Sequence, residues 1–160
     1  MGNCTSSGGL GGAGGQISKM SNENLPNLTG VSDKQIKYGE DRRAGYIGTY
    51  NYFARYFYET DESGLNDIQI QNRRVRNEGI RSSMMDDVMF EKDGKLLRDK
   101  VDEWRAARRE KGIKTTKQER KEYQETLMKK ALKEKYKEIQ KNIKEHTDAK
   151  WWIERKYMVD

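Results

Sequence analysis

The stretch "TDAKWWIERK", residues 147–156, decides the fold, because it sets Trp151, Trp152 and Ile153 side by side in a very polar chain. Only 33% of the 160 residues are hydrophobic and 36% are charged, so another segment must cover this cluster. Neighbouring residues of a helix point ~100° apart. We therefore expect one indole to be fully buried and the other to lie at the rim, with its ring N–H bonded to a polar partner.

A helix that begins at Ser32 is the predicted cover for the indoles. Ser32 followed three residues later by Gln35 forms a capping box, and Val31 and Ile36 flank it at the spacing of a hydrophobic staple. These local signals indicate a helix start independently of any tertiary contact.

The predicted helix carries one apolar, largely aromatic stripe with steps of three, four or seven residues. Its members are Ile36, Arg43, Ile47, Tyr50, Ala54 and Phe57. We expect Tyr38, Tyr46 and Ile47 to cover the indoles, so that the two ends of the ordered region close on each other. Glycines weaken the helix, so a break near Gly48 is an alternative, with residues 49–59 resuming as a helix or a strand.

Two more helical segments are predicted in the middle of the chain. The first is one helix interrupted near Gly79, or two short helices, with its inward residues at Ile68, Val75, Ile80, Met84 and Val88. After a turn at residues 91–95, the second helix has one face formed by Leu97, Val101, Trp104 and Arg108, and Gly112 ends it.

The longest helical pattern begins after Thr116, which forms a capping box with Glu119. Its apolar stripe consists of Tyr123, Leu127, Ala131, Tyr136, Ile139 and Ile143. About 30 helical residues extend ~45 Å, so we expect one end to project or to pair with a partner. A coiled coil is the alternative for this segment.

Composition indicates a mainly α fold: one small helical domain over residues 28–160, one long amphipathic helix, and a flexible Gly/Ser-rich tail over residues 1–27. No apolar run is long enough to cross a membrane, and no secretory signal is visible. One cysteine cannot form an internal disulfide, and a single histidine excludes ordinary Cys/His zinc patterns, so no metal or cofactor is expected.

The net charge of +6 is uneven along the chain. Residues 95–146 hold 18 Lys/Arg against 10 Asp/Glu, a balance of +8, which leaves −2 for the rest. Such a surface attracts phosphate backbones, unless it is only a solvated helix face of mixed charge. The candidate nucleic-acid-binding residues are Arg73, Arg74, Arg76, Arg105, Arg108, Arg109, Lys114 and Lys117.

The first residues, "MGNCTS", fit the pattern for N-terminal acylation, with Gly2 as the myristoyl acceptor and Cys4 placed for a second chain. The competing interpretation is a chance start of a flexible tail.

The segments "LPNLTGVSDKQIKYGEDRR" and "TDAKWWIERK" together resemble a family of small proteins encoded by bacteriophages and bacterial mobile elements. Members carry a Ser/Asp-Glu-Lys-Gln-Ile-x-Trp-Ala-Glu-type helix and an Ala-Lys-Trp-Trp-Ile-Asp-type closing segment. This chain has Tyr38 and Gly39 in place of Trp-Ala. The resemblance implies a phage-like origin and a core formed by the paired ends, and it transfers no catalytic residue.

We therefore predict a non-enzymatic phage or mobile-element accessory or structural protein that acts through protein–protein assembly, in the bacterial cytoplasm or the virion. A protein partner or a second copy is the expected ligand. One alternative is a sequence-nonspecific nucleic-acid-binding protein, and another is a lipid-anchored peripheral membrane protein.

Overall fold

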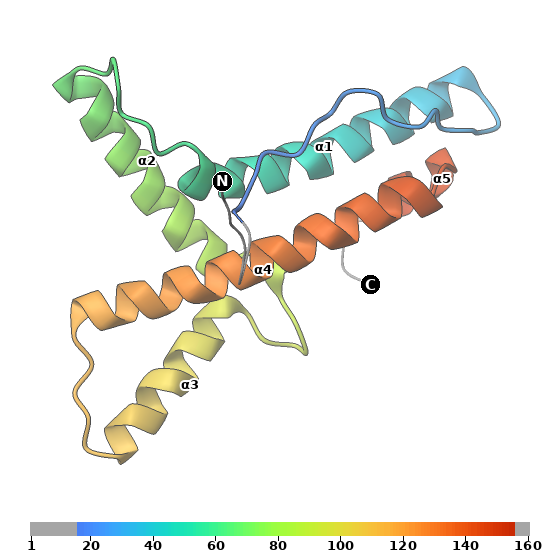
Figure 1. Cartoon of the computed structure of the whole chain (residues 1–160). Helices are drawn as coiled ribbons and strands as arrows, with labels where there is room; N and C mark the ends of the chain where they lie inside the picture. The colour runs from blue at the N-terminus through green and yellow to red at the C-terminus, as the bar shows by residue number, and fades with distance from the viewer. Residues whose placement is uncertain (1–15, 156–160) are drawn as a thin grey trace, which may run out of the picture.

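The computed structural model describes residues 16–155, and in that range the chain is built from helices and contains no strand (Figure 1). The prediction of a mainly α fold is confirmed. The elements are α1 (Asp33–Tyr58), α2 (Asp67–Met85), the 3-10 helix η1 (Val88–Phe90), α3 (Leu97–Glu110), α4 (Lys117–Glu145) and α5 (Ala149–Glu154).

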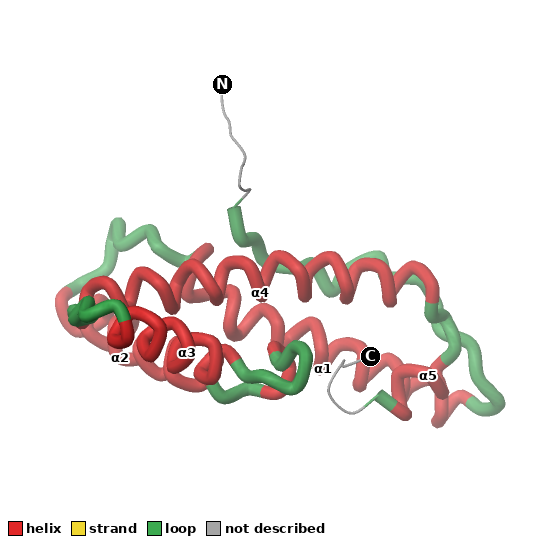
Figure 2. Tube along the Cα trace, turned by 90° about the horizontal axis from the view of Figure 1, so that it is seen from below, coloured by secondary structure: helices red, strands yellow, loops and turns green. Residues whose placement is uncertain are grey.

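Helix α4 crosses the whole molecule and organises the other helices. Its C-terminal half runs beside α1 and α5, whereas α2 and α3 meet it near its middle and then diverge (Figure 1). Seen from below, α4 lies across one side of the remaining helices (Figure 2). The result is a packed body at one end and two arms at the other, one formed by α2 and one by the α3–α4 hairpin.

The tryptophan pair is covered by α1, as predicted. Trp152 is fully buried, its ring centroid lies 6.0 Å from that of Tyr46, and its Nε1–H donates to the carbonyl of His146 at 2.8 Å. Trp151 lies at the rim, stacked on the imidazole of His146 at 3.9 Å, with the Arg155 guanidinium 4.3 Å from its ring centre. The expectation that the rim indole carries the bonded N–H is wrong, because this bond belongs to the buried one.

Two of the three predicted covering residues lie in the core. Tyr46 and Ile47 are buried, and Ile153 is half-buried on the other side of the contact. Tyr38 is 53% exposed and does not contribute to the core, so its predicted core role is wrong. The reason is helical phase: Gly39 is the residue that faces α5, and Tyr38 points ~100° away from it.

Gly39 permits the closest approach between α1 and α5. A Cβ atom placed on Gly39 would lie 2.7 Å from the Cβ and 2.8 Å from the Cα of Ala149. Both residues are buried, so the two helices touch almost backbone to backbone at this point. A side chain at Gly39 therefore does not fit without moving α5 off α1.

Backbone pairing locks the same corner. The Thr29 N–H donates to the Thr147 carbonyl at 2.7 Å, and the Ala149 N–H donates to the Thr29 carbonyl at 2.8 Å. Residues 118 positions apart in sequence are thereby held together at the entrance to α1 and the start of α5.

The segment before α1 belongs to the packed body. Ile17, Met20 and Leu28 are buried, and the Asn51 side chain bonds both the N–H and the carbonyl of Met20, at 2.7 and 2.9 Å. Arg43, a buried cation, donates to the Pro26 carbonyl at 2.8 Å. The tail predicted to extend to residue 27 is therefore packed from Ile17 onward, while residues 1–15 lie outside the described part of the chain.

Helix α1 is continuous, so the alternative of a break near Gly48 is wrong. Ser32 caps it by accepting from the Gln35 N–H, but the Gln35 side chain accepts from the Val31 N–H, one residue earlier than a reciprocal capping box requires. Val31 is 91% exposed, so the predicted hydrophobic staple does not form.

Helix α2 is also continuous, through Gly79, and its predicted inward face is only partly correct. Ile80 and Met84 are buried, whereas Ile68, Val75 and Val88 are exposed. Ile68 and Val75 are the apolar residues on the outer face of the first half of the helix. That half belongs to an arm, where no neighbouring helix covers the outer face.

The core of the body joins α1, α4 and η1 through aromatic contacts. Tyr50 packs on Tyr136 at 5.6 Å between ring centroids, and Phe53 packs edge-on against Phe90 at 5.2 Å. In α4 the predicted stripe is correct for Ile139 and Ile143, but Met128 and Leu132, one position beyond Leu127 and Ala131, are the fully buried residues of its first half.

We predict that Gly39→Ala destabilises the protein by about 1–3 kcal/mol, because the added methyl group overlaps Ala149. Gly45→Ala is the matched control on the same helix, since a Cβ at Gly45 meets nothing within 4 Å. The control should gain about 1 kcal/mol from helix propensity. Urea denaturation measures both, and equal effects of the two substitutions would contradict the close contact.

The tryptophan pair gives a second prediction. Trp152→Ala should cost about 3–5 kcal/mol, because it empties a fully buried site and removes the bond to His146. Trp151→Ala should cost about 1 kcal/mol, the order of a stacking contact at the surface. If the two variants had similar unfolding midpoints, the burial of Trp152 would be disproved.

Candidate nucleic-acid interface

The predicted basic residues separate onto the two arms. Arg73, Arg74 and Arg76 lie on α2, and the other five lie on or beside the α3–α4 turn. The N-terminal end of α2 and the α3–α4 turn lie at opposite extremes of the arm side of the molecule (Figure 1). The structure therefore does not bring the two predicted groups together.

The arginines of α2 serve the fold of their own arm. Arg76 is paired with Glu59 at 2.6 Å and Arg73 with the same carboxylate at 3.7 Å, while Arg73 also donates to the Asp61 carbonyl at 2.8 Å. Hydrogen bonds from Arg76 and Arg55 hold the pKa of Glu59 at about 2. Of the three predicted residues, only Arg74 is exposed and makes no such contact with residues 16–155.

The turn between α3 and α4 is held by hydrogen bonds on both sides. At the end of α3, Gly112 has φ 75°, its N–H donates to the Arg109 carbonyl, and the Ile113 N–H reaches the Arg108 carbonyl at 2.9 Å. This is a Schellman motif, for which the left-handed glycine is suited. Thr116 and Glu119 then form the predicted capping box at the start of α4, with bonds of 3.1 and 3.0 Å.

A stacked pair of rings holds the two helices of the arm together. Trp104 of α3 lies parallel to Tyr123 of α4 with centroids 4.1 Å apart, and the Arg108 guanidinium lies 5.0 Å from the Trp104 ring centre. Arg108 also bonds the Thr115 hydroxyl at 3.0 Å and pairs with Glu119 at 2.7 Å. The sequence predicts Arg108 as a nucleic-acid contact, but in the structure its side chain links α3 to the start of α4.

The end of this arm carries a net charge equal to that of the whole protein. Residues 105–121 hold eight Lys/Arg against two Asp/Glu, a balance of +6, which equals the net charge of the full chain, so the other residues sum to zero. We call residues 105–121 the basic tip. Arg108 is its one cation for which an ion pair is seen among residues 16–155; the others are Arg105, Arg109, Lys111, Lys114, Lys117, Arg120 and Lys121.

Sequence reasoning includes Lys111 in the second basic cluster but misses two cations of the basic tip, namely Arg120 and Lys121. They could have been found by summing charge over one hairpin turn instead of over individual helical faces. Lys111 is exposed in the turn, and Arg120 and Lys121 follow the cap of α4.

Of the two acidic residues of the basic tip, Glu119 is engaged within the arm itself. Hydrogen bonds from the Thr116 backbone and hydroxyl lower the pKa of Glu119, and Arg108 lowers it further. This carboxylate is ionised, and its charge interacts with the cap of α4 and with Arg108. The cations around it face solvent with a net positive field.

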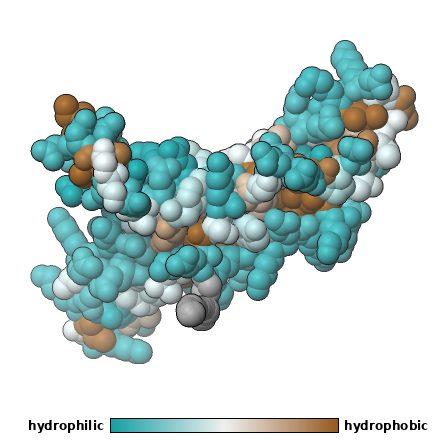
Figure 3. Space-filling view, turned by 45° about the horizontal axis from the view of Figure 1, so that its top comes forward, coloured by the Kyte–Doolittle hydropathy of each residue, from teal (hydrophilic) through white to brown (hydrophobic). Residues whose placement is uncertain are grey.

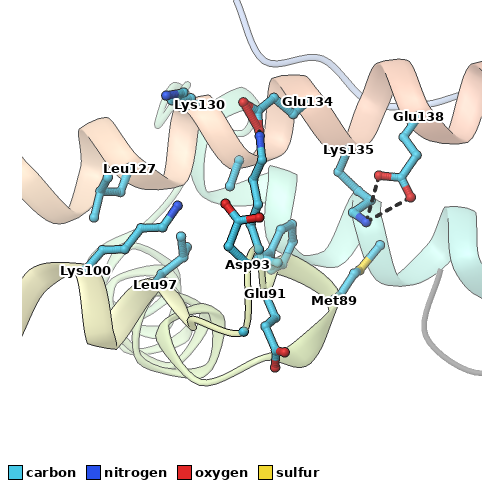
Figure 4. Close-up of a pocket in the computed structure, with 14 residues that line it drawn as sticks. Met89, Glu91, Asp93, Leu97, Lys100, Leu127, Lys130, Glu134, Lys135 and Glu138 are labelled. Carbon is cyan, nitrogen blue, oxygen red and sulfur yellow. Dashed lines mark hydrogen bonds and ion pairs between the residues drawn. The ribbon is translucent and has the colours of Figure 1, made fainter. Parts of the chain in front are cut away.

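A groove separates α4 from the segment that connects η1 to α3 (Figure 4). It has a volume of about 790 Å³, and its lining combines lysines and carboxylates around apolar residues. Lys92 pairs with Glu134 across it at 3.5 Å, and buried Lys135 bonds both oxygens of Glu138. Because its charges are balanced and several are already paired, the groove has no preference for an anion.

Other chemistry has no visible support in the described part of the chain. Among residues 16–155, no group of three or more His, Cys, Asp or Glu side chains is arranged to hold a metal ion. Within the same range, no helix is long and apolar enough to cross a membrane. Gly2 and Cys4, the predicted acylation sites, lie outside the described residues.

The ion pairs of Glu59 predict an acid-sensitive arm. Its pKa of about 2 is below the usual 4.5, so its stabilising contribution is present above pH ~4.5 and is lost as the pH falls toward 2. The stability difference between wild type and Glu59→Gln should therefore shrink over this window. Urea midpoints at several pH values measure it, with Glu62→Gln, an exposed neighbour, as the control. A difference that is independent of pH would refute the assignment.

Comparison with protein-family models, curated proteins and solved structures finds no match, so the resemblance to a phage and mobile-element family stays a prediction.

Proposed function

We propose that the protein is a non-enzymatic nucleic-acid-binding protein that holds the phosphate backbone at its basic tip. The single observation that supports this is the placement of a net charge of +6, equal to that of the full chain, on residues 105–121 at the end of an arm. The resemblance in the two terminal segments suggests a phage or mobile-element setting, in the host cytoplasm or the virion.

This proposal reverses the order of the functions predicted from the sequence. The prediction from the sequence favours assembly over nucleic-acid binding, because mixed charge on a helix is usually only solvated. Outside residues 105–121 that reasoning fits, since basic and acidic residues balance there and many pair locally, such as Lys37 with Asp41. The basic tip is different, because seven cations there lack ion pairs in the described chain.

The geometry of the arm suits a phosphate backbone. Arg105 and Arg109 are one turn apart on α3, as are Lys117 and Lys121 on α4, so each pair spans ~6 Å along its helix. Each strand of duplex DNA carries one phosphate per ~3.4 Å of helix axis, so each pair can reach more than one phosphate. The N-terminus of α4 adds the positive end of a 29-residue helix dipole beside them.

The mode of binding follows from the residue types. Exposed lysines and arginines on a hairpin turn make contacts to phosphates, which carry no base sequence. Binding should therefore be insensitive to sequence and steeply dependent on salt.

The test is a triple charge reversal at the basic tip, Arg109→Glu, Lys114→Glu and Lys117→Glu. These residues are exposed and form no ion pairs in the described chain. Three lost phosphate contacts should lower the slope of log K against log salt by about 2.7 for duplex DNA. Fluorescence anisotropy with two unrelated duplexes measures affinity and sequence dependence together.

The matched control reverses three exposed lysines in the packed body, Lys34→Glu, Lys141→Glu and Lys150→Glu. It changes the net charge by the same amount and should alter the salt slope much less. Equal losses in the two variants would show that only the total charge matters and would overturn the assignment of the basic tip.

Assembly with a protein partner is the second candidate function. It is favoured by the outer face of α2, where Ile68 is 73% exposed and Val75 is 62% exposed. Both residues lie two turns apart on one side of a helix whose first half is not packed into the core.

A further inference from the structure

The two arms end in surfaces of opposite charge. At the start of α2, residues 60–72 contain Asp61, Glu62 and Asp67 and no basic residue, so the segment carries −3, and Arg73 lies beside it and donates to the Asp61 carbonyl. We call this segment the acidic loop. The basic tip carries +6. All three acidic residues are exposed, as are the cations Arg109, Lys111, Lys114 and Lys117.

Each end also presents an exposed isoleucine. Ile68 is 73% exposed beside the acidic loop, and Ile113 is 43% exposed at the centre of the basic tip. The surface is otherwise largely hydrophilic, and apolar atoms gather at the ends of the arms as well as over the body (Figure 3). Each end therefore combines a charge with an apolar contact, as a docking surface does.

Both ends are preorganised by their own hydrogen bonds. In the acidic loop the Ser63 N–H donates to the Asp61 carboxylate at 2.9 Å, Gly64 has φ 78°, and Asn66 forms a reciprocal capping box with Gln69. The same bond lowers the pKa of Asp61, so it is ionised at neutral pH. With the Schellman motif and capping box of the basic tip, neither surface has to be ordered before contact.

The two surfaces cannot meet within one chain. The α2 end and the α3–α4 turn point to opposite extremes of the arm side (Figure 1). Only a second copy can bring an acidic loop onto a basic tip.

We infer that the acidic loop of one copy docks on the basic tip of the next, with Ile68 against Ile113, so that copies associate head to tail. The contact is heterologous, because it joins two different surfaces, and it leads to open chains or a ring and not to a symmetric dimer. It occupies the same cations as nucleic acid, so the two ligands compete. The inference does not depend on nucleic-acid binding.

The experiment uses light scattering of the full chain across a concentration series, at about 50 mM and about 500 mM salt. The average mass of the wild-type protein should be at least about twice its 18.7 kDa monomer mass at low salt and should return to the monomer mass at high salt. Wild type that stays monomeric at low salt would overturn the inference.

Two variants separate the surfaces. The loop variant, Asp61→Asn, Glu62→Gln and Asp67→Asn, removes the charge and keeps the side-chain acceptors. The tip variant is the triple reversal at Arg109, Lys114 and Lys117. Each alone should be monomeric, and far-UV circular dichroism shows that each is folded. A neutralised control at three exposed acids of the body, Glu23→Gln, Glu145→Gln and Glu154→Gln, should associate like wild type.

The decisive experiment mixes the two variants. The loop variant still has a basic tip and the tip variant still has an acidic loop, so the mixture should form one-to-one complexes that stop at two chains. A mixture that remains monomeric, or a loop variant that associates like wild type, would contradict the head-to-tail contact.

DNA binding keeps the two proposals distinguishable. The loop variant should bind duplex DNA as well as wild type does, because its basic tip is intact, and added DNA should disperse the wild-type chains. Association without DNA binding would refute the proposed function only, and DNA binding without association would refute the head-to-tail contact only.

Discussion

The close contact between Gly39 of α1 and Ala149 of α5 is the constraint on which the packed body depends. Because the two backbones nearly touch there, the following turn of α5 places Trp152 against Tyr46, and the Trp152 ring N–H reaches the His146 carbonyl. A methyl group at Gly39 would push the helices apart and open the site of the indole. The Thr29 pairing with Thr147 and Ala149 fixes the same corner through the backbone, so the two ends of the described chain support each other.

This arrangement concentrates the apolar residues at one end and leaves the arms with few of them. The arms are held by a different set of interactions: Glu59 with Arg73 and Arg76 on α2, and the Trp104–Tyr123 stack on the hairpin. Ion pairs and a single stack stabilise less than a buried core does, so the arms have the lower local stability. The ends of the arms are ordered instead by the short hydrogen-bonded motifs at their turns. These motifs require only local bonds, which explains how a chain with 33% hydrophobic residues can present two ordered surfaces away from its core.

The sequence predicts the helix ends that local hydrogen bonds determine. It predicts less well which residues are buried, because that depends on packing against distant elements. The caps at Ser32 and Thr116 and the end of α3 at Gly112 are confirmed, because each depends on residues within one turn. The role of Tyr38 is wrong because only the packed helix α5 shows that Gly39 faces inward. Packing of Met20 depends on Asn51, 31 residues away, and no local signal in a Gly/Ser-rich segment indicates it. The candidate site follows the same division: its cations are visible in the sequence, but the sequence does not show that Arg108 is an internal brace or that the α2 group lies on the other arm.

The separation of charge from the body has a physical consequence for binding. If the seven cations of the basic tip for which no ion pair is seen in the described chain lay on the body, nearby carboxylates of the balanced surface would offset much of their field at distances within a Debye length of ~8 Å. At the end of the arm, the eight Lys/Arg of residues 105–121 outnumber the two acidic residues of that segment, so an approaching polyanion meets a net charge of +6 there. The same geometry makes the acidic loop of another copy the strongest complementary surface that the described chain itself offers. Nucleic acid has a higher charge density than three carboxylates, so under the two proposals we expect it to displace the second copy when both are present. Assembly and nucleic-acid binding would then depend on one set of cations.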